Sequence, residues 1–441
     1  MKARDSVARA LAAALLAGEW TDSALLARAR HLLGSSTRRS QQALIGELLS
    51  AIGTGYPPSP GWLADFFLRS ARFDRATAPL QRRAAPIPFA LEPAIFTPAA
   101  KFAHLDIPRL AAVEDLARWL QISVAHLQWY ADAEHRQRRK TAPVLLHYNH
   151  LFTAKRSGPP RLIEAPKPRL KAIQQRILRE ILNAVPNHDC VHGFVKGRSC
   201  LSAAQTHAGE AIVVAVDLKD FFASTPLRRA HGIFRSLGYP WAVARLLTGL
   251  CSTATPTSVF LALPPAQRHD QRTRQMFSSP HLPQGAPTSP PLANLAARAL
   301  DTRLHGLARA LEANYTRYAD DLVFSGGAHF ARGIGPFLAS VKRIAAEEGY
   351  AVNHRKTRIM RRGGAQRVTG LVVNDHLNLP RADYDVLKAT LHNCRKNGPQ
   401  AENRTGHPKF RAHLEGRVVW AENVNPARGA RLRRMFEKIR W

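Results

Sequence analysis

Cysteine, acidic residues and long apolar runs are all scarce in this chain of 441 residues. The four cysteines are scattered and form no C-x-x-C pair, which argues against a zinc site or a disulfide framework and fits a reducing cytoplasm. The longest early apolar run, Ala10–Ala17, is far shorter than the roughly 20 residues of a membrane helix. We interpret it as part of an amphipathic helix, rather than as a signal peptide or a membrane span.

Acidic residues are strongly outnumbered, because 64 Lys and Arg stand against 32 Asp and Glu and give a formal net charge of +32. Such an excess calls for a polyanionic partner. Nucleic acid is the first candidate, and an anionic membrane surface is the second. Hydrophobic residues make up 45% of the chain, which excludes global disorder. The length corresponds to two or three domains.

The pattern along the chain predicts four regions. Residues 1–78 indicate several short helices that form an accessory module. Residues 79–98 contain five prolines and are predicted to be a linker. Residues 99–379 begin with helices and then alternate short β-rich runs with longer helices. Residues 380–441 are predicted to be helical and are basic.

Acidic side chains lie at the ends of predicted strands. The β-branched run Ala211–Leu218 predicts a buried strand that ends in Asp217. The runs Tyr315–Tyr318 and Leu322–Ser325 flank Ala319-Asp320-Asp321 and predict a hairpin with acids at its turn. Between these strands, residues 289–311 are predicted to form one helix with a leucine-rich face.

Three aspartates, Asp217, Asp320 and Asp321, suggest a metal site. Alone, Asp217 is better explained by a helix cap or a turn. Adjacent acids in a tight turn repel each other, which costs stability unless a cation compensates, and the many Lys and Arg residues leave salt bridges as an alternative. Acidic sites on neighbouring strands could hold two divalent ions about 3.5–4 Å apart, an arrangement that performs in-line phosphoryl transfer. Mg²⁺ fits oxygen ligands beside phosphates, and the lack of Cys and His in these motifs argues against zinc.

The order of several sequence blocks resembles that of reverse transcriptases. Tyr318-Ala319-Asp320-Asp321 matches the Y-x-D-D turn of that family, and Asp217–Phe222 resembles its first palm motif. The other similar blocks are Arg161–Pro166 with Leu170, Lys171 and Gln174; His192–Phe194 with Gly197–Ser199; Leu282–Pro290; Asn353 with Lys356 and Thr357; and Val368–Leu371. The resemblance runs in order over residues 155–374.

Within this family, the retron-type bacterial enzymes are the most similar. Val368, Thr369 and Gly370 resemble the retron tripeptide that helps to read the cognate RNA, so RNA binding is expected of them. Retrons usually carry N-A-x-x-H before the first palm motif, and here Ala203 replaces the Asn, which leaves the retron subtype open. The Q-G pair of the block at 282–290 differs from the S-Q type of diversity-generating enzymes. No H-N-H or zinc cluster of the kind found in many group II intron proteins follows the palm.

The resemblance implies an α+β fold of the right-hand polymerase type, with fingers and palm in residues 99–379 and a thumb in residues 380–441. The palm would contain a small antiparallel sheet. Two Mg²⁺ ions would be bound by the catalytic carboxylates, which are Asp217, Asp320 and Asp321. Lys356 would protonate the departing pyrophosphate, and a plain surface lysine is the alternative for it.

The resemblance also implies a deoxynucleotide site. Its expected residues are Lys155, Arg161, Phe222, Gln284 and Gly285. The two cations would hold the triphosphate, for which a guanidinium is well suited. Phe222 would exclude a ribose 2′-hydroxyl, with a core phenylalanine as the alternative. Gln284 would contact the incoming nucleotide, and Gly285 would let the backbone come close.

The implied function is RNA-directed DNA synthesis in the cytoplasm. The expected partners are a structured non-coding RNA encoded nearby, deoxynucleoside triphosphates and the DNA product. Priming from a 2′-hydroxyl of the RNA would leave a branched RNA–DNA hybrid. Retrons act in defence against phage, usually with a separate effector protein, and no effector domain is evident unless residues 1–78 form one. The alternatives are a group II intron-like reverse transcriptase that assists splicing and a polymerase fold kept only to bind RNA. The intact aspartates argue against the latter.

Overall fold

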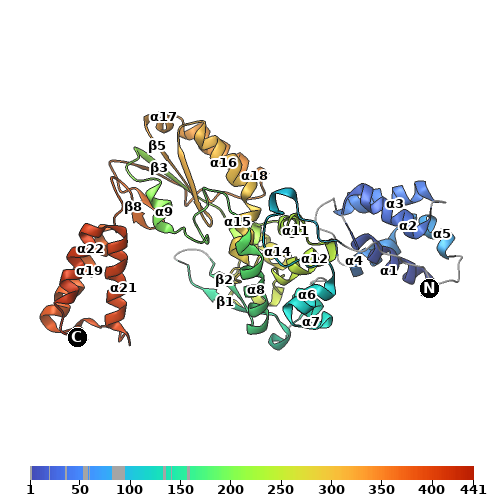
Figure 1. Cartoon of the computed structure of the whole chain (residues 1–441), viewed down its shortest axis with the longest axis horizontal. Helices are drawn as coiled ribbons and strands as arrows, with labels where there is room; N and C mark the ends of the chain where they lie inside the picture. Colours follow the sequence, from blue (N-terminus) through green and yellow to red (C-terminus); the bar gives the residue numbers. More distant parts are fainter. Residues whose placement is uncertain are drawn as a thin grey trace. The chain divides into compact units, whose positions relative to one another are not determined.

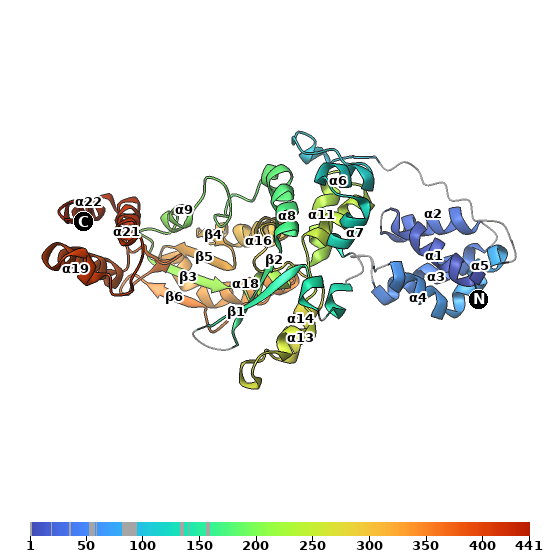
Figure 2. The ribbon, with the colours of Figure 1, turned by 90° about the horizontal axis from the view of Figure 1, so that it is seen from below.

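The structure is a computed structural model that describes residues 2–18, 20–34, 37–52, 58, 60–81, 95–132, 136–140, 142–155 and 159–441. Helices alternate with small antiparallel sheets, so the chain is α+β, as predicted (Figures 1 and 2). It divides into two compact units. Unit 1 comprises Met1–Pro186 and Phe222–Ala296, and unit 2 comprises Asn187–Phe221 and Ala297–Trp441.

Unit 1 begins with five helices that cover the predicted accessory module. They are α1 (Lys2–Leu16), α2 (Asp22–Leu33), α3 (Arg38–Ile52), α4 (Pro60–Arg69) and α5 (Ala71–Gln81). Ser70 separates α4 from α5, because its hydroxyl accepts a hydrogen bond from the Arg72 N–H and donates one to Glu47. Helix α5 ends at Gln81, so the first three residues of the predicted linker are helical.

One hydrophobic cluster holds these five helices together. Its fully buried members include Leu11, Leu15, Leu25, Leu48, Phe67 and Phe73, and Trp241 of a later helix also belongs to it. Leu11 and Leu15 lie in the apolar run that starts at Ala10, so the amphipathic helix predicted there is confirmed. Among the described residues, none of the helices is both long and apolar enough to cross a membrane.

The predicted linker is only partly described, since residues 82–94 lie outside the described ranges. Its last residues are packed against the end of helix α11 (Leu227–Ser236). The N–H groups of Thr97 and Ala99 donate to the carbonyls of Gly238 and Ser236 at 3.0 Å each. Gly238 has a φ of +106°, and a Cβ there would lie 2.6 Å from the Pro98 nitrogen, so this approach requires glycine.

The rest of unit 1 is a mainly helical body with one β-ribbon. The ribbon pairs β1 (Tyr148–Thr153) with β2 (Arg161–Pro166) in antiparallel fashion. The helices are α6 (Val113–Leu120), α7 (Val124–Ala131), α8 (Pro168–Glu180), α10 (Phe221–Ser224, which starts at the last residue of unit 2), α11, α12 (Trp241–Leu250), α13 (Thr257–Leu261), α14 (Gln271–Ser278) and α15 (Ser289–Ala296). Short 3-10 turns lie at Ala100–Phe102, Arg136–Arg139, Pro143–Leu145, Leu182–Ala184 and Pro265–Gln267.

Unit 2 contains a four-stranded antiparallel sheet in the order β4-β5-β3-β6. Its strands are β3 (Ile212–Asp217), β4 (Asn314–Tyr318), β5 (Asp321–Gly326) and β6 (Arg358–Arg361), and β7 (Arg367–Val368) and β8 (Leu371–Val372) form a separate small hairpin. The predicted strand at 211–218 and the predicted hairpin at 315–325 are confirmed. The helices of this unit before residue 380 are α9 (Cys200–Gln205), α16 (Arg298–Arg309), α17 (Ala328–Arg332) and α18 (Ile334–Glu347).

The single helix predicted over 289–311 is wrong, because α15 ends at Ala296 and α16 begins at Arg298. Ala297 between them has φ −83° and ψ 3°, and this ψ is far from the helical value near −42°. The continuous leucine pattern carries no signal for such a break.

The two faces of the sheet bury different partners. Val213 and Val323 pack with Ala204 of α9, whereas the Phe324 ring lies edge-on to Phe337 of α18 with centroids 4.8 Å apart. Figure 1 shows α9 on one side of the sheet and α16 and α18 on the other. Side chains alternate along a strand, so residues an even number of positions from Val213 and Val323 share the α9 face.

The C-terminal region is helical, as predicted. Its helices are α19 (Arg381–Asn397), α20 (Pro399–Glu402), α21 (Phe410–Val424) and α22 (Pro426–Glu437). Helices α19, α21 and α22 share a small core that includes Leu391, Val418, Leu432 and Phe436. Their remaining surface carries most of the Lys and Arg residues of this region.

Candidate active site

Two of the three predicted carboxylates face each other across neighbouring strands. Asp217, the last residue of β3, is the register partner of Asp321, the first residue of β5. Asp217 lies four residues after Val213, and Asp321 lies two before Val323, so both side chains belong to the α9 face of the sheet. Asp217 is buried with 7% exposure, whereas Asp321 is exposed. The central strand pair of unit 2 therefore brings these two acids together.

Asp320 lies in the tight turn between β4 and β5. Ala319 adopts a left-handed backbone with φ +56°, and the Asp320 carbonyl accepts a hydrogen bond of 2.9 Å from the Leu218 N–H. Gly193 supports the turn from outside, because a Cβ at this position would lie 2.7 Å from the Ala319 nitrogen. The turn thus requires both a strained alanine and a closely approaching glycine.

Lys356 and Asn353 hold the Asp217 carboxylate. The Lys356 Nζ donates to Asp217 Oδ2 at 2.8 Å, and the Asn353 Nδ2 donates to Oδ1 at 3.0 Å. The hydrogen bond to Asp217 raises the pKa of Lys356, with further contributions from the charges of Asp217, Asp320 and Asp321. The structure therefore places Lys356 beside the acids as their counter-ion, with an ammonium group that stays protonated.

The donor set fits divalent cations that take oxygen ligands. The pKa of Asp321 is raised to about 6. The first cause is loss of hydration at its carboxyl group, which is more enclosed than the residue as a whole, and the second is repulsion by Asp320 and Asp217. Within the described ranges, no three His, Cys, Asp or Glu side chains converge into a ready-made metal cage. Mg²⁺ commonly relies on one or two carboxylates completed by substrate phosphates, so crowded acids without a closed cage suit it.

Phe221 and Phe222 differ in burial. Phe221 is 3% exposed, and its ring lies 5.6 Å from the Tyr350 ring and 5.4 Å from the Arg317 guanidinium carbon. Phe222 is only partly buried. The structure thus gives the core role to Phe221, and the role of Phe222 as a gate against ribose stays a prediction.

The remaining predicted nucleotide-binding residues belong to unit 1. Lys155 follows β1 and is exposed, and Arg161 opens β2 and is also exposed. The Gln284 carbonyl accepts a 2.8 Å hydrogen bond from the Glu164 N–H. Gly285 has φ +134°, and a Cβ there would lie 2.9 Å from the Glu164 carbonyl oxygen. The block around Gln284 and Gly285 is therefore packed directly against the β-ribbon.

A buried charged pair lies beneath this contact. The carboxylate of Glu164 is within 2.8 Å of His281 Nε2 and accepts a 2.6 Å hydrogen bond from the Thr255 hydroxyl. The other ring nitrogen of His281 lies 2.8 Å from the Ser279 carbonyl, which can only accept, so both nitrogens donate and His281 is an imidazolium. Burial opposes this charge, but Glu164 outweighs it and raises the pKa of His281.

This pair predicts a pH-dependent stability. A histidine whose pKa is raised on folding stabilises the fold below its unfolded pKa of about 6.5, and the contribution is lost as the pH rises through the folded value. His281→Gln should therefore lower the melting temperature most near pH 6 and progressively less toward pH 9. His147→Gln is the control, because burial lowers the pKa of His147 to about 4, so this histidine is neutral from pH 6 to pH 9. Equal destabilisation by His281→Gln at every pH would contradict the charged pair.

The tripeptide Val368-Thr369-Gly370 forms the turn of the β7–β8 hairpin. Thr369 and Gly370 both have positive φ, +49° and +88°, as a tight two-residue hairpin requires. The Val368 side chain is 1% exposed, and the Thr369 hydroxyl donates to the Cys200 carbonyl at 2.9 Å. Recognition of RNA by this tripeptide stays a prediction, and the buried Val368 side chain leaves the exposed turn as the part able to touch RNA.

Several residues of the site were not predicted individually from the sequence. Asn353 and Gly193 lie within recognised blocks, but nothing in their spacing showed their contacts with Asp217 and the turn. Glu164 and His281 are 117 positions apart, so their pairing becomes visible only in the fold. A charged residue in the middle of a predicted strand is a usable signal, and Arg317 in β4 is an example.

Comparison with known proteins agrees with the resemblance found in the sequence motifs. Residues 153–393 match the family model described as reverse transcriptase (RNA-dependent DNA polymerase). The chain is 40% identical over 339 residues to the Retron Mx65 reverse transcriptase of Myxococcus xanthus, which covers 76% of this chain and 73% of the relative. It is 37% identical to the Retron Mx162 reverse transcriptase of the same organism, over 73% of this chain and 66% of that one.

A more distant relative extends the similarity to another bacterium. The Retron Ec86 reverse transcriptase of Escherichia coli is 30% identical over 296 residues, which is 66% of this chain and 80% of the relative. The matched region of the family model contains all of the strands β2 to β8 and the three aspartates.

Proposed function

Because the chain belongs to the retron-type reverse transcriptases, a family of RNA-directed DNA polymerases, we propose that it copies a cognate structured non-coding RNA into DNA from a 2′-hydroxyl of that RNA. The product would be a branched RNA–DNA hybrid. We further propose that the reaction occurs in the cytoplasm and serves defence against phage, together with a separate effector protein. Family membership also confirms the predicted right-hand type of the α+β fold.

One observation supports the catalytic assignment most strongly. Asp217 and Asp321 are register partners at the ends of adjacent strands, and Asp320 lies in the turn that joins β4 to β5. Reverse transcriptase domains use divalent metal ions, and we propose that two Mg²⁺ ions bind to these three carboxylates. When bound, such ions activate the attacking hydroxyl and neutralise the leaving pyrophosphate.

The protein side chains supply positioning and a proton. Asn353 fixes the orientation of the Asp217 carboxylate, and Lys356 neutralises it until substrate arrives. The Lys356 side chain is 55% exposed, so it has room to leave Asp217. Its raised pKa keeps the ammonium charged, and the ammonium can then give a proton to the departing pyrophosphate.

Nucleotide binding would use the residues of unit 1. Arg161 and Lys155 are exposed cations at the end of the β1–β2 ribbon where the chain passes from one strand to the other, and there they can pair with a triphosphate. The backbone of Gln284 is anchored to β2, which orients the Gln284 side chain for contact with the nucleotide. These roles rest on the family resemblance together with the exposure and anchoring of each residue.

The net charge of +32 predicts a steep salt dependence of RNA binding. Each phosphate that pairs with Lys or Arg releases counter-ions, so about six contacts would cost about 10³-fold in affinity between 50 and 200 mM salt. Filter binding or fluorescence anisotropy with a labelled RNA measures this slope. If the logarithm of the affinity does not fall with the logarithm of the salt concentration, the excess positive charge does not serve RNA binding.

The native protein itself tests the proposed priming. We expect the protein purified from its own host to carry one small DNA of defined length, because a template that presents its own 2′-hydroxyl makes initiation intramolecular. On a denaturing gel, RNase should shorten this species without destroying it, and a debranching enzyme should release its 5′ end.

Other results of the same gel would have distinct meanings. A spliced intron RNA without DNA would favour the intron-type alternative. A heterogeneous RNA smear without a DNA band would contradict the proposed priming, while RNA-directed DNA polymerase activity would still be assayed on an added primer and template.

A further inference from the structure

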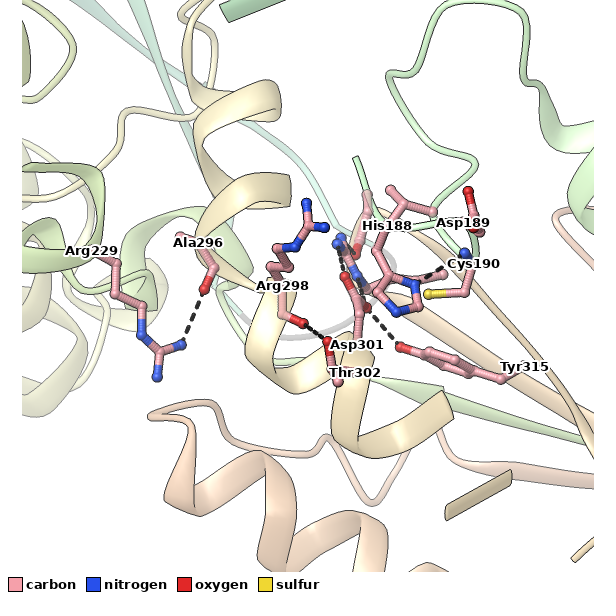
Figure 3. Close-up of polar contacts among 12 residues, drawn as sticks. His188, Asp189, Cys190, Arg229, Ala296, Arg298, Asp301, Thr302 and Tyr315 are labelled. Atoms are coloured by element: carbon pink, nitrogen blue, oxygen red, sulfur yellow. Dashed lines mark hydrogen bonds and ion pairs between the residues drawn. The ribbon is translucent and has the colours of Figure 1, made fainter. Parts of the chain in front are cut away.

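A fully buried ion pair lies behind the catalytic turn in unit 2. Arg317 of β4 and Asp301 of α16 are both 0% exposed. The guanidinium donates from Nε to Asp301 Oδ1 and from Nη2 to Oδ2, each at 2.7 Å. The Tyr315 hydroxyl donates to Oδ1 at 3.0 Å, and Figure 3 shows this hydroxyl directed at Asp301. The guanidinium fork and the tyrosine hydroxyl therefore hold the carboxylate with three hydrogen bonds.

The same guanidinium reaches the turn that carries the acids. Arg317 Nη1 donates to the Ala319 carbonyl at 3.2 Å, one residue before Asp320. The Arg317 backbone is also fixed, since its N–H donates to the Cys190 carbonyl and its carbonyl accepts from the His192 N–H, both at 2.8 Å. The side chain thus connects helix α16 to the turn through one rigid, planar group.

Stability alone does not explain such a pair. Two charges lose much of their hydration when buried, and well-packed apolar residues in their place are often equally or more stabilising. By contrast, the turn needs support, because Ala319 holds a left-handed φ of +56° that a residue with a Cβ adopts at a cost. The Arg317 hydrogen bond falls on the carbonyl of that same strained residue.

We propose that Arg317 is a positioning residue that, anchored by Asp301, fixes the orientation of the turn and so the spacing of the acids at Asp320 and Asp321. This inference rests on the proposed function, in which those two carboxylates bind divalent ions. Arg317 does not touch substrate or metal in this account. It acts through the Ala319 carbonyl, as groups behind a metal site commonly orient the ligands in front of it.

The test removes the pair without leaving a buried charge. The double variant Arg317→Met with Asp301→Leu deletes both partners, and Arg317→Lys keeps the charge but loses the planar fork that serves Asp301 and Ala319 together. The matched control is Arg303→Met. Arg303 lies on α16, as Asp301 does, but it pairs with Glu347 and Glu348 at the surface. Mn²⁺ serves as the metal probe, with the free ion counted by electron paramagnetic resonance.

We expect the double variant to melt within a few degrees of the wild type and to bind RNA equally well. Its Mn²⁺ affinity should fall about 10-fold or more, and its kcat should fall by up to about 100-fold while the KM for deoxynucleotides changes little. Arg317→Lys should show the same pattern more weakly, and Arg303→Met should resemble the wild type in every measurement.

A purely structural pair would behave differently. If the folded double variant keeps the Mn²⁺ affinity and kcat of the wild type, the positioning role is wrong. If the double variant fails to fold, Arg317→Lys decides by the same two measurements. If the proposed function itself is wrong, the wild-type protein and Asp320→Asn will bind Mn²⁺ equally. This outcome is distinguishable from failure of the positioning role alone.

Discussion

Asp320→Asn is expected to abolish nucleotide incorporation, with a loss of about 10³-fold or more. Neutralising a metal-binding carboxylate removes several kcal/mol of transition-state stabilisation, and each 1.36 kcal/mol corresponds to about tenfold in rate. The melting temperature should stay near that of the wild type or rise slightly above pH 6. The reason is that Asp320 contributes to the repulsion that raises the pKa of Asp321 to about 6. Steady-state incorporation and thermal unfolding measure both effects.

Asp375→Asn is the control for this prediction. Asp375 is an exposed acid of the same unit, and its side chain is 70% exposed beside Arg362. Its neutralisation should leave incorporation nearly unchanged. Substantial metal-dependent synthesis by Asp320→Asn would show that Asp320 is not a metal ligand.

Phe222→Ala is expected to admit ribonucleotides, with discrimination against the 2′-hydroxyl reduced by about 10²-fold. The physical reason is steric, since the predicted gate excludes the extra oxygen through ring volume rather than through a hydrogen bond. Because Phe222 is only partly buried, its loss should cost less than the ~3–5 kcal/mol of an emptied aromatic core site. Single-nucleotide incorporation with matched ribo- and deoxyribonucleotides measures the ratio.

Phe221→Ala provides the matched comparison one residue earlier. Phe221 is 3% exposed against Tyr350, so its truncation should cost the full ~3–5 kcal/mol. Its sugar discrimination should change far less than that of Phe222→Ala. If Phe222→Ala leaves sugar discrimination unchanged and costs the full ~3–5 kcal/mol of stability, Phe222 is a core residue instead.

The sequence predicted the elements whose local signal is strong. The β-branched run before Asp217 and the paired runs around Asp320 are strands in the structure, with the acids where the pattern placed them. The helical C-terminal region also follows its pattern. The break at Ala297 was missed because leucine periodicity continues across it, and the interruption lies in backbone angles that no residue type there demands.

The contacts that support the site depend on residues far apart in the chain. Arg317 pairs with Asp301 across 16 positions, and Lys356 reaches Asp217 across 139. A charge in the middle of a strand signals that a partner exists, but it does not say which one. Gly193 illustrates the same limit, because the sequence shows a glycine while only the fold shows that Ala319 fills the space of its missing Cβ.

The acids at 217, 320 and 321 are proposed to bind the catalytic divalent ions, and local cleavage tests this assignment most directly. Fe²⁺ in place of Mg²⁺, with ascorbate and peroxide, produces hydroxyl radicals beside the bound ion that cut the nearest backbone. We predict cuts near Asp217 and near Asp320–Asp321, mapped by mass spectrometry, which excess Mg²⁺ suppresses and Asp320→Asn eliminates. Cuts that lie elsewhere in the chain, or that persist unchanged in Asp320→Asn, would contradict the account.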